Sequence, residues 1–131
     1  MDIGDRSDLA HASEVAPVYW RALLQAGRTD RLTGLLDRAI TGGTPELTAR
    51  ALVLRGDVLR ARGETREALK QGYLRVIMLM ESERAVVPEA LFRAMQCFEE
   101  LGEVNYAERM RQRLLDDFAT SDFARRITGG A

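Results

Sequence analysis

The chain contains little of the side-chain chemistry that enzymes and metal sites use. Of its 131 residues one is a cysteine, Cys97, and one is a histidine, His11. A single cysteine excludes a disulfide within the chain, and nucleophilic catalysis needs a nucleophile held beside a base, which these two distant residues do not supply. No phosphate-binding loop and no cluster typical of metal ligands is present in the sequence. We therefore expect no catalytic residue, no cofactor and no bound metal.

Long apolar runs are also missing. No stretch approaches the roughly 18 apolar residues that a membrane helix requires. The segment from Met1 to Glu14 carries three aspartates where a secretory signal has a basic start and an apolar run. We expect a chain that does not insert into a membrane and, if complete, is cytoplasmic.

Charge of one sign is not in excess. The formal net charge is −1, and all but one of the 19 basic residues are arginines, Lys70 being the exception. Acidic residues are interspersed with the arginines, and no aromatic residues that could stack on bases alternate with them. We therefore do not favour binding to RNA or DNA. The arginines fit two interpretations that the sequence leaves open: recognition of carboxylates or phosphates, and solvation of helix surfaces.

What the sequence does have is helix-forming residues. Ala, Leu, Arg and Glu dominate and proline occurs only three times, a composition that predicts an all-α protein. Apolar residues recur at helical spacing between glycines and prolines that mark helix ends. We predict a mobile N-terminal arm over residues 1–14, able to be helical from Ser7, and one helical domain over residues 15–131. Its predicted parts are helix hairpins at about 16–42, 44–81 and 87–118 and a final helix at 121–127.

The predicted hairpins repeat. Each has its tight turn at a glycine, namely Gly27, Gly63 and Gly102, so the turns are 36 and 39 residues apart. A period of this length is typical of an α-solenoid, in which stacked hairpins bury the apolar faces that one hairpin leaves exposed.

The middle unit, ALVLRGDVLRARGETREALKQGYLRVIMLM (residues 51–80), resembles a tetratricopeptide repeat (TPR). In that family a small residue, here Gly56, lets two helices approach closely. A turn glycine, here Gly63, follows seven residues later, and a Glu-Ala pair, here Glu67 and Ala68, opens the second helix. The resemblance implies a solenoid that binds other proteins.

The outer units match the family less well. Met95 stands in the place of Gly56 in the third unit, and Trp20 stands there in the first. The tail from residue 107 to 126 resembles the ending of bacterial TPR proteins of the cell envelope, including those associated with Tol–Pal, with Ser121 in the helix-capping place. If the chain is a trimmed fragment of such an envelope protein, the resemblance implies a periplasmic location.

The resemblance also implies where a partner docks, because the first helix of each hairpin lines the concave side in that family. We expect an extended or helical peptide held there by Val53 and Phe92 as apolar contacts, with Arg50 and Arg60 pairing with its acids. The alternative is that the polar residues are only solvated. The residues predicted by helical phase are Arg21 and Gln25 in the first hairpin, Arg50, Val53, Asp57 and Arg60 in the second, and Phe92, Gln96 and Glu99 in the third.

A second hypothesis is self-association. No strongly polar capping helix precedes the first hairpin, so it is expected to leave apolar surface exposed. Tyr19 and Trp20 near that end are the predicted contacts between copies. A structural, self-assembling module and a TPR domain of a larger envelope protein are therefore the alternatives to a peptide-binding scaffold.

Overall fold

Helices are the regular secondary structure of the described part of the chain. The computed structural model describes the backbone of residues 6–129 and the side chains of residues 16–129. Within that part there are helices and no strand, which confirms the predicted all-α class. None of these helices combines the length and the apolar character needed to cross a membrane. The helices are α1 (Arg6–Gln25), α2 (Thr29–Gly42), α3 (Pro45–Ala61), α4 (Thr65–Ala68), η1 (Leu69–Tyr73), α5 (Leu74–Leu79), α6 (Val87–Glu100), α7 (Val104–Asp117) and α8 (Asp122–Ile127).

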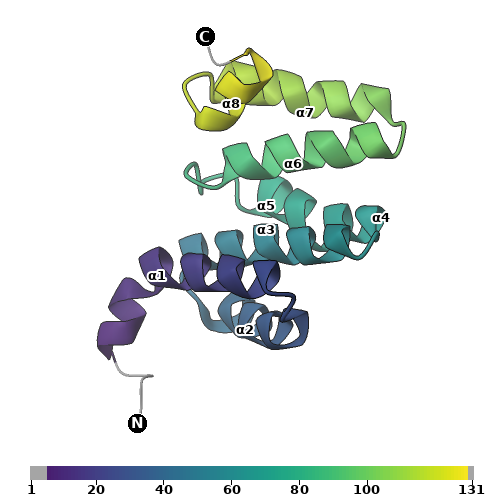
Figure 1. Cartoon of the computed structure of the whole chain (residues 1–131). Coiled ribbons are helices and arrows are strands. Elements are labelled where there is room, and N and C mark those ends of the chain that lie inside the picture. The colour runs from purple at the N-terminus through teal and green to yellow at the C-terminus, as the bar shows by residue number, and fades with distance from the viewer. Residues whose placement is uncertain (1–5, 130–131) are drawn as a thin grey trace.

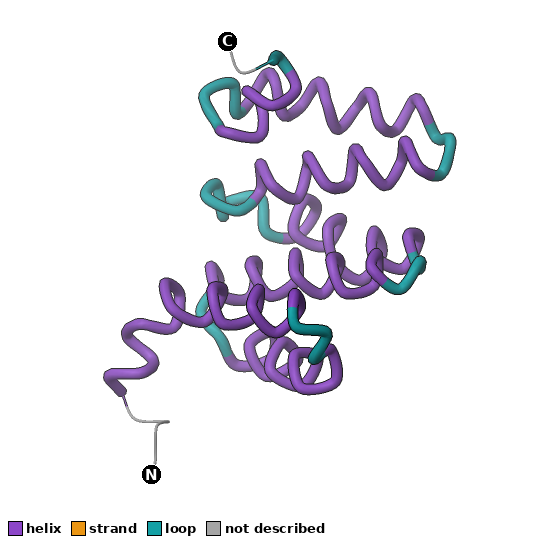
Figure 2. The backbone as a smooth tube through the Cα atoms, viewed as in Figure 1, coloured by secondary structure: helices purple, strands orange, loops and turns teal. Residues whose placement is uncertain are grey.

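The helices are arranged in successive layers (Figures 1 and 2). α1 and α2 lie at one end of the molecule, α7 and α8 lie at the other, and α3 to α6 fill the space between. η1 is a π-helical turn that joins α4 to α5, so these three elements make one continuous helix. From α2 onward, the helix boundaries agree within about two residues with those predicted from the sequence.

α1 begins closer to the N-terminus than predicted. The sequence predicts a mobile arm over residues 1–14 and a helix with Pro17 in its first turn, but α1 begins at Arg6 and contains Pro17 in its interior. Residues 1–5 of the predicted arm lie outside the described residues. Figure 1 shows the beginning of α1 bending away from the stack. An interior proline bends a helix in this way because it removes one backbone hydrogen bond and its ring meets the preceding turn.

The three hairpin turns share one conformation. Each glycine has a left-handed φ angle, which is strained for residues that carry a Cβ, and the N–H after it donates to the carbonyl five residues earlier. This is the Schellman ending of a helix, and it confirms the turns predicted at these glycines. The φ angles are 76°, 81° and 76° for Gly27, Gly63 and Gly102, and the hydrogen bonds join Arg28 to Leu23 at 2.9 Å, Glu64 to Leu59 at 2.9 Å and Glu103 to Phe98 at 2.8 Å.

Two predicted helix caps are also confirmed. The Thr44 hydroxyl accepts a hydrogen bond from the Leu47 N–H at 3.2 Å, at the start of α3. The Ser121 hydroxyl accepts one from the Ala124 N–H at 3.1 Å, at the start of α8. Each cap satisfies a backbone donor that the first helical turn leaves without a partner.

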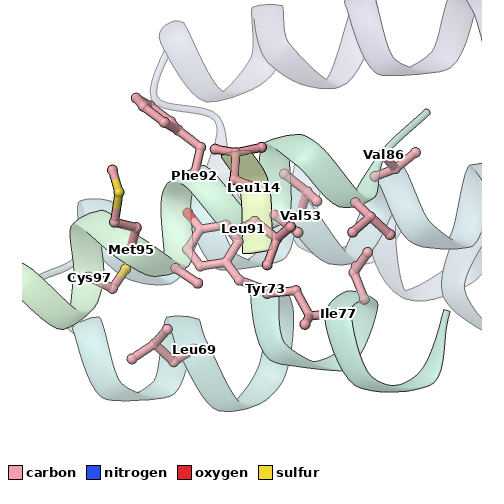
Figure 3. Packing of buried hydrophobic residues seen from close by; sticks show 14 of the residues in the cluster. Val53, Leu69, Tyr73, Ile77, Val86, Leu91, Phe92, Met95, Cys97 and Leu114 are labelled. Carbon is pink, nitrogen blue, oxygen red and sulfur yellow. The ribbon is translucent and has the colours of Figure 1, made fainter. Parts of the chain in front are cut away.

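α3 lies between two hydrophobic cores and contributes residues to both. Leu54 and Val58 belong to a smaller core with residues of α1 and α2, whereas Val53 belongs to a larger core that continues through α8. Figure 3 shows part of the larger core, where Tyr73 and Leu91 lie next to Val53. The buried members of the smaller core are Trp20, Leu23, Leu32, Leu36, Ala39, Leu47, Ala51, Leu54 and Val58.

Candidate partner-binding surfaces

A ring of charged side chains joins the first helices of the three hairpins, α1, α3 and α6. Asp57 of α3 accepts a hydrogen bond from Arg21 Nη1 at 2.9 Å, and its other oxygen lies 3.7 Å from Arg93 Nε. Glu89 Oε2 completes the ring, 2.8 Å from Arg93 Nε and 3.8 Å from Arg21 Nη2. The Asp57 side chain is only 9% exposed, so its charge depends on these partners more than on water. We call the surface formed by these four residues the first-helix face.

Tyr73 contacts the same carboxylate from inside the larger core. Its hydroxyl donates a hydrogen bond to Asp57 Oδ1, and its side chain is fully buried. Burial and the neighbouring carboxylate raise the pKa of Tyr73. The phenol therefore keeps its proton and remains a hydrogen-bond donor.

The Tyr73 ring occupies this place because α3 and η1 approach each other at two glycines. A Cβ on Gly72 would lie 2.7 Å from Gly56 Cα and from the Leu52 carbonyl oxygen, and a Cβ on Gly56 would lie 2.6 Å from the Tyr73 ring. The close approach predicted at Gly56 is thus confirmed. Sequence reasoning missed Gly72 and the π-helical turn, which lets Gly72 and Tyr73 both lie against α3. Such turns occur frequently at functional positions.

A second polar link joins α3 to α6 close to the hairpin turns. Arg60 Nη1 donates to Gln96 Oε1 at 3.0 Å, and Arg60 Nη2 pairs with Glu100. Cys97 is buried nearby, and burial raises the pKa of its thiol to about 11. Because the thiolate is the reactive form, a thiol with this pKa is a poor nucleophile at neutral pH.

Val53 and Phe92, the two apolar contacts predicted for a partner, are already packed. Val53 is 2% exposed and Phe92 is 9% exposed, so neither is free of packing, contrary to the prediction. Val53 is covered because α3 is buried on two sides. Phe92 is covered because α8 folds back over α6, which brings the Phe123 ring centroid to 5.4 Å. Helical phase within α6 does not encode the position of α8.

The predicted polar residues remain nearer the surface, and several bind one another. Arg50 pairs with Glu46 of its own helix at 3.0 Å, while Gln25 on α1 and Glu99 on α6 are exposed. The sequence offered one signal for the ring members that it did not predict, since Glu89 and Arg93 are spaced to pair on one helix face. The predicted residues that the structure joins in pairs are Arg21 with Asp57 and Arg60 with Gln96.

The two residues predicted for self-association differ in exposure. Trp20 is 4% exposed and belongs to the smaller core, so it is not a free contact, contrary to the prediction. Tyr19 is 43% exposed, and its neighbour Val18 is 71% exposed. Adjacent helix positions point about 100° apart, so only one of the two aromatic side chains faces the core.

Hollows occur on both sides of α3. The one on the first-helix face has a volume of about 50 Å³, whereas one between α2, α3 and η1, here named the α2–α3 hollow, has about 210 Å³. A shallow hollow on the outer side of η1 and α5, here named the α5 hollow, has about 290 Å³. The α2–α3 hollow is lined by Thr33, Leu36, Asp37, Arg55, Val58, Leu59, Arg62 and Gln71, and the α5 hollow by Lys70, Leu74, Arg75, Met78 and Leu79.

Among the described residues, no three potential metal ligands of the His, Cys, Asp or Glu type lie together. Comparisons of the chain with models of known protein families, with curated proteins and with solved structures found no match. The function is therefore inferred from the geometry and chemistry of these surfaces.

Proposed function

We propose that the chain is a non-catalytic protein-interaction scaffold, an α-solenoid of three TPR-like hairpins with a short final helix, that binds a peptide or a partner protein. The observation that carries the proposal is the recurrence of one glycine turn, with the same left-handed φ and the same hydrogen bond, at Gly27, Gly63 and Gly102. Hairpins that repeat a turn and stack bury a continuous core, and their first helices make an extended surface for a partner.

The first-helix face supports this function because it is held in place before any partner binds. The ring around Asp57 fixes α1, α3 and α6 relative to one another. A surface ordered in advance loses less conformational entropy on binding. At its edge Arg50, with a side chain 31% exposed, pairs only with an exposed glutamate of its own turn. A carboxylate of a bound peptide replaces that glutamate at low cost.

Selection from a random peptide display library on the immobilised full chain tests this function. We expect enriched peptides that bind with micromolar affinity by calorimetry and that shift the amide resonances of α3 and its neighbours. Arg50→Glu is expected to weaken such peptides severalfold. The matched control is Arg125→Glu on α8, which breaks a similar exposed pair with Asp122 and leaves affinity unchanged. Failure to enrich any peptide above an unrelated helical protein contradicts the proposal.

Self-association is a second candidate, favoured by the exposure of Val18 and Tyr19 on α1. An apolar pair at the end of a repeat stack is the natural contact for a second copy. Sedimentation velocity of the full chain tests it: a dimer that Val18→Glu converts to a monomer supports this function, and a monomer at high concentration excludes it.

A further inference from the structure

The α2–α3 hollow has apolar side chains at its base and polar side chains around it. Leu36 and Val58 lie at its base and are 2% and 3% exposed, while Leu59 is half-buried beside them. Its volume of about 210 Å³ is below the roughly 300–1,000 Å³ of pockets that hold drug-sized ligands. The hollow is therefore of a size for an apolar side chain of a partner rather than for a small-molecule ligand.

The rim of this hollow is mainly basic. Arg55 Nη2 lies 2.9 Å from Asp37, the one carboxylate among the lining residues. Arg62, the residue that follows the last residue of α3, lines the same hollow as Arg55. It is exposed and forms no ion pair with any residue whose side chain the structure describes. Its guanidinium is thus available to an incoming carboxylate.

The α5 hollow extends this surface. Gln71, which lines the α2–α3 hollow, accepts a hydrogen bond from Arg75 Nη2 at 3.1 Å, and Arg75 lines the α5 hollow. Met78 and Leu79 there are 72% and 78% exposed. We call the two hollows together the back surface, since their residues lie on α2, η1 and α5 and on the side of α3 away from the ring.

The charges of the back surface indicate what binds it. Four lining residues are basic, namely Arg55, Arg62, Lys70 and Arg75, and one, Asp37, is acidic. The whole chain, in contrast, has a net charge of −1. A basic border around apolar hollows complements a segment that has both acidic and bulky apolar side chains. Nucleic acid fits less well, because no aromatic side chain lines either hollow for base stacking.

We propose that the back surface docks an acidic peptide segment of another protein. The segment inserts one bulky apolar side chain over Leu36 and Val58 and places carboxylates against Arg62 and Lys70. This inference rests on the proposed scaffold function, but it assigns binding to a different face from the ring. Methionine at the α5 end suits the task, because its flexible thioether adapts to differently shaped partners.

Fluorescence polarisation with the full chain and labelled synthetic peptides tests the proposal. The probes carry glutamates around a central leucine, phenylalanine or tryptophan; one comparison series has serine at the centre, another has lysines in place of the glutamates. We expect saturable binding of an acidic apolar probe, with resonance shifts confined to α2, η1, α5 and one side of α3. The comparison probes are expected to bind at least tenfold more weakly.

Matched double variants locate the surface. Arg62→Glu with Lys70→Glu is expected to weaken the probe at least tenfold. Arg38→Glu with Arg111→Glu makes the same change of net charge at arginines outside both hollows and is expected to leave affinity within twofold. Thr33→Trp, which fills the hollow from an exposed helix position, is expected to block binding without unfolding the chain.

The outcomes separate this inference from the scaffold function. Absence of saturable binding by every acidic apolar probe overturns it, as does equal binding of an oligothymidylate, which indicates a nucleic-acid surface. Display-selected peptides that bind the Arg62→Glu, Lys70→Glu variant normally but fail to bind the Arg50→Glu variant support the scaffold function and contradict peptide docking on the back surface. If no peptide of any kind binds, both proposals fail.

Discussion

The first and second hairpins have the same glycine turn, but different residues stand where their helices pack. In the larger core α3 meets η1 at Gly56 and Gly72, where the helix backbones touch. In the smaller core the place seven residues before the turn glycine is taken by Trp20, which is 4% exposed. The distance between paired helices is set by the side chains at their contact. The turn is therefore shared, while the packing of the paired helices depends on the residues at their contact.

The cores also differ in extent. The smaller core draws its buried residues from α1, α2 and α3, whereas the larger one extends from α3 to α8. Stabilisation from burial grows with the apolar area removed from water, and regions with less buried apolar surface open first. We expect α1 and α2 to unfold locally before the rest of the chain.

Removal of the largest side chain of the smaller core should produce the largest effect. Trp20→Ala is expected to destabilise α1 and α2 by about 3 to 5 kcal/mol, the usual cost of such a truncation in a core. Hydrogen exchange should show lost protection in these two helices while α6 and α7 stay protected. The adjacent Tyr19→Ala is the control, since Tyr19 is 43% exposed and should change little. Equal loss of protection throughout the chain contradicts the independence of the two cores.

Adding a Cβ at the glycine contact between α3 and η1 should destabilise the larger core. Gly72→Ala places a Cβ 2.7 Å from backbone atoms of α3, and such overpacking typically costs about 1 to 3 kcal/mol. The matched control is Gly34→Ala in α2, where a Cβ meets no heavy atom within 4 Å. That change should stabilise the chain by about 0.5 to 1 kcal/mol, because alanine is the better helix former. Urea unfolding followed by circular dichroism measures both, and the same sign for both variants counts against the close contact.

The charged ring connects α1, in the smaller core, with α3 and α6 in the larger core. Removing the charge of its central carboxylate, Asp57, tests how much this connection stabilises the chain. Asp57→Asn removes one of the two carboxylates that join Arg21 to Arg93 and leaves only Glu89 between them. We expect a loss of about 2 kcal/mol, below the 3 to 5 of a fully buried pair because the arginines are partly solvated. Asp37→Asn, whose side chain is 57% exposed in its pair with Arg55, should cost under about 1 kcal/mol. Denaturant midpoints that move equally for the two variants would show that the ring has no special role.

The features that sequence reasoning predicted are those decided locally. The turn at Gly63 and the caps at Thr44 and Ser121 depend on residues within one helical turn, and each is present. The start of α1 was the local exception. Pro17 is compatible with the first turn of a helix and with a bent interior, and its own chemistry does not choose between them.

The features that it missed depend on which helix faces meet. Phe92 lies on a face of α6 that its own hairpin does not cover. It is buried because α8 packs against that face. Similarly, Arg93 joins Asp57 only after α6 is placed beside α3. The back surface is formed by side chains of α2, α3, η1 and α5 that lie far apart in sequence. A single sequence does not report such long-range packing.

Alkaline pH should lower the stability of the larger core in particular, and this is the smallest of the effects that we predict. Burial raises the pKa of Cys97 in the larger core from 9.0 to about 11, and the pKa of Tyr73 is raised as well. Both groups stay neutral in the folded chain while the unfolded chain ionises first, so the folded state binds more protons above pH 9. The stability that these groups contribute is complete below that pH and is lost as pH rises toward 11, by about 1 kcal/mol at pH 10 for the thiol.

Cys97→Ala tests this sign, because it removes the thiol contribution while leaving Tyr73 in place. The variant should be less stable at neutral pH, since it leaves a small cavity, but its urea midpoint should fall less steeply between pH 9 and pH 10. Reaction of Cys97 with a thiol reagent should follow unfolding of the larger core rather than opening of α1 and α2. Thiol labelling that Trp20→Ala accelerates as strongly as Gly72→Ala would show that the two cores open together and that α3 transmits damage from one to the other.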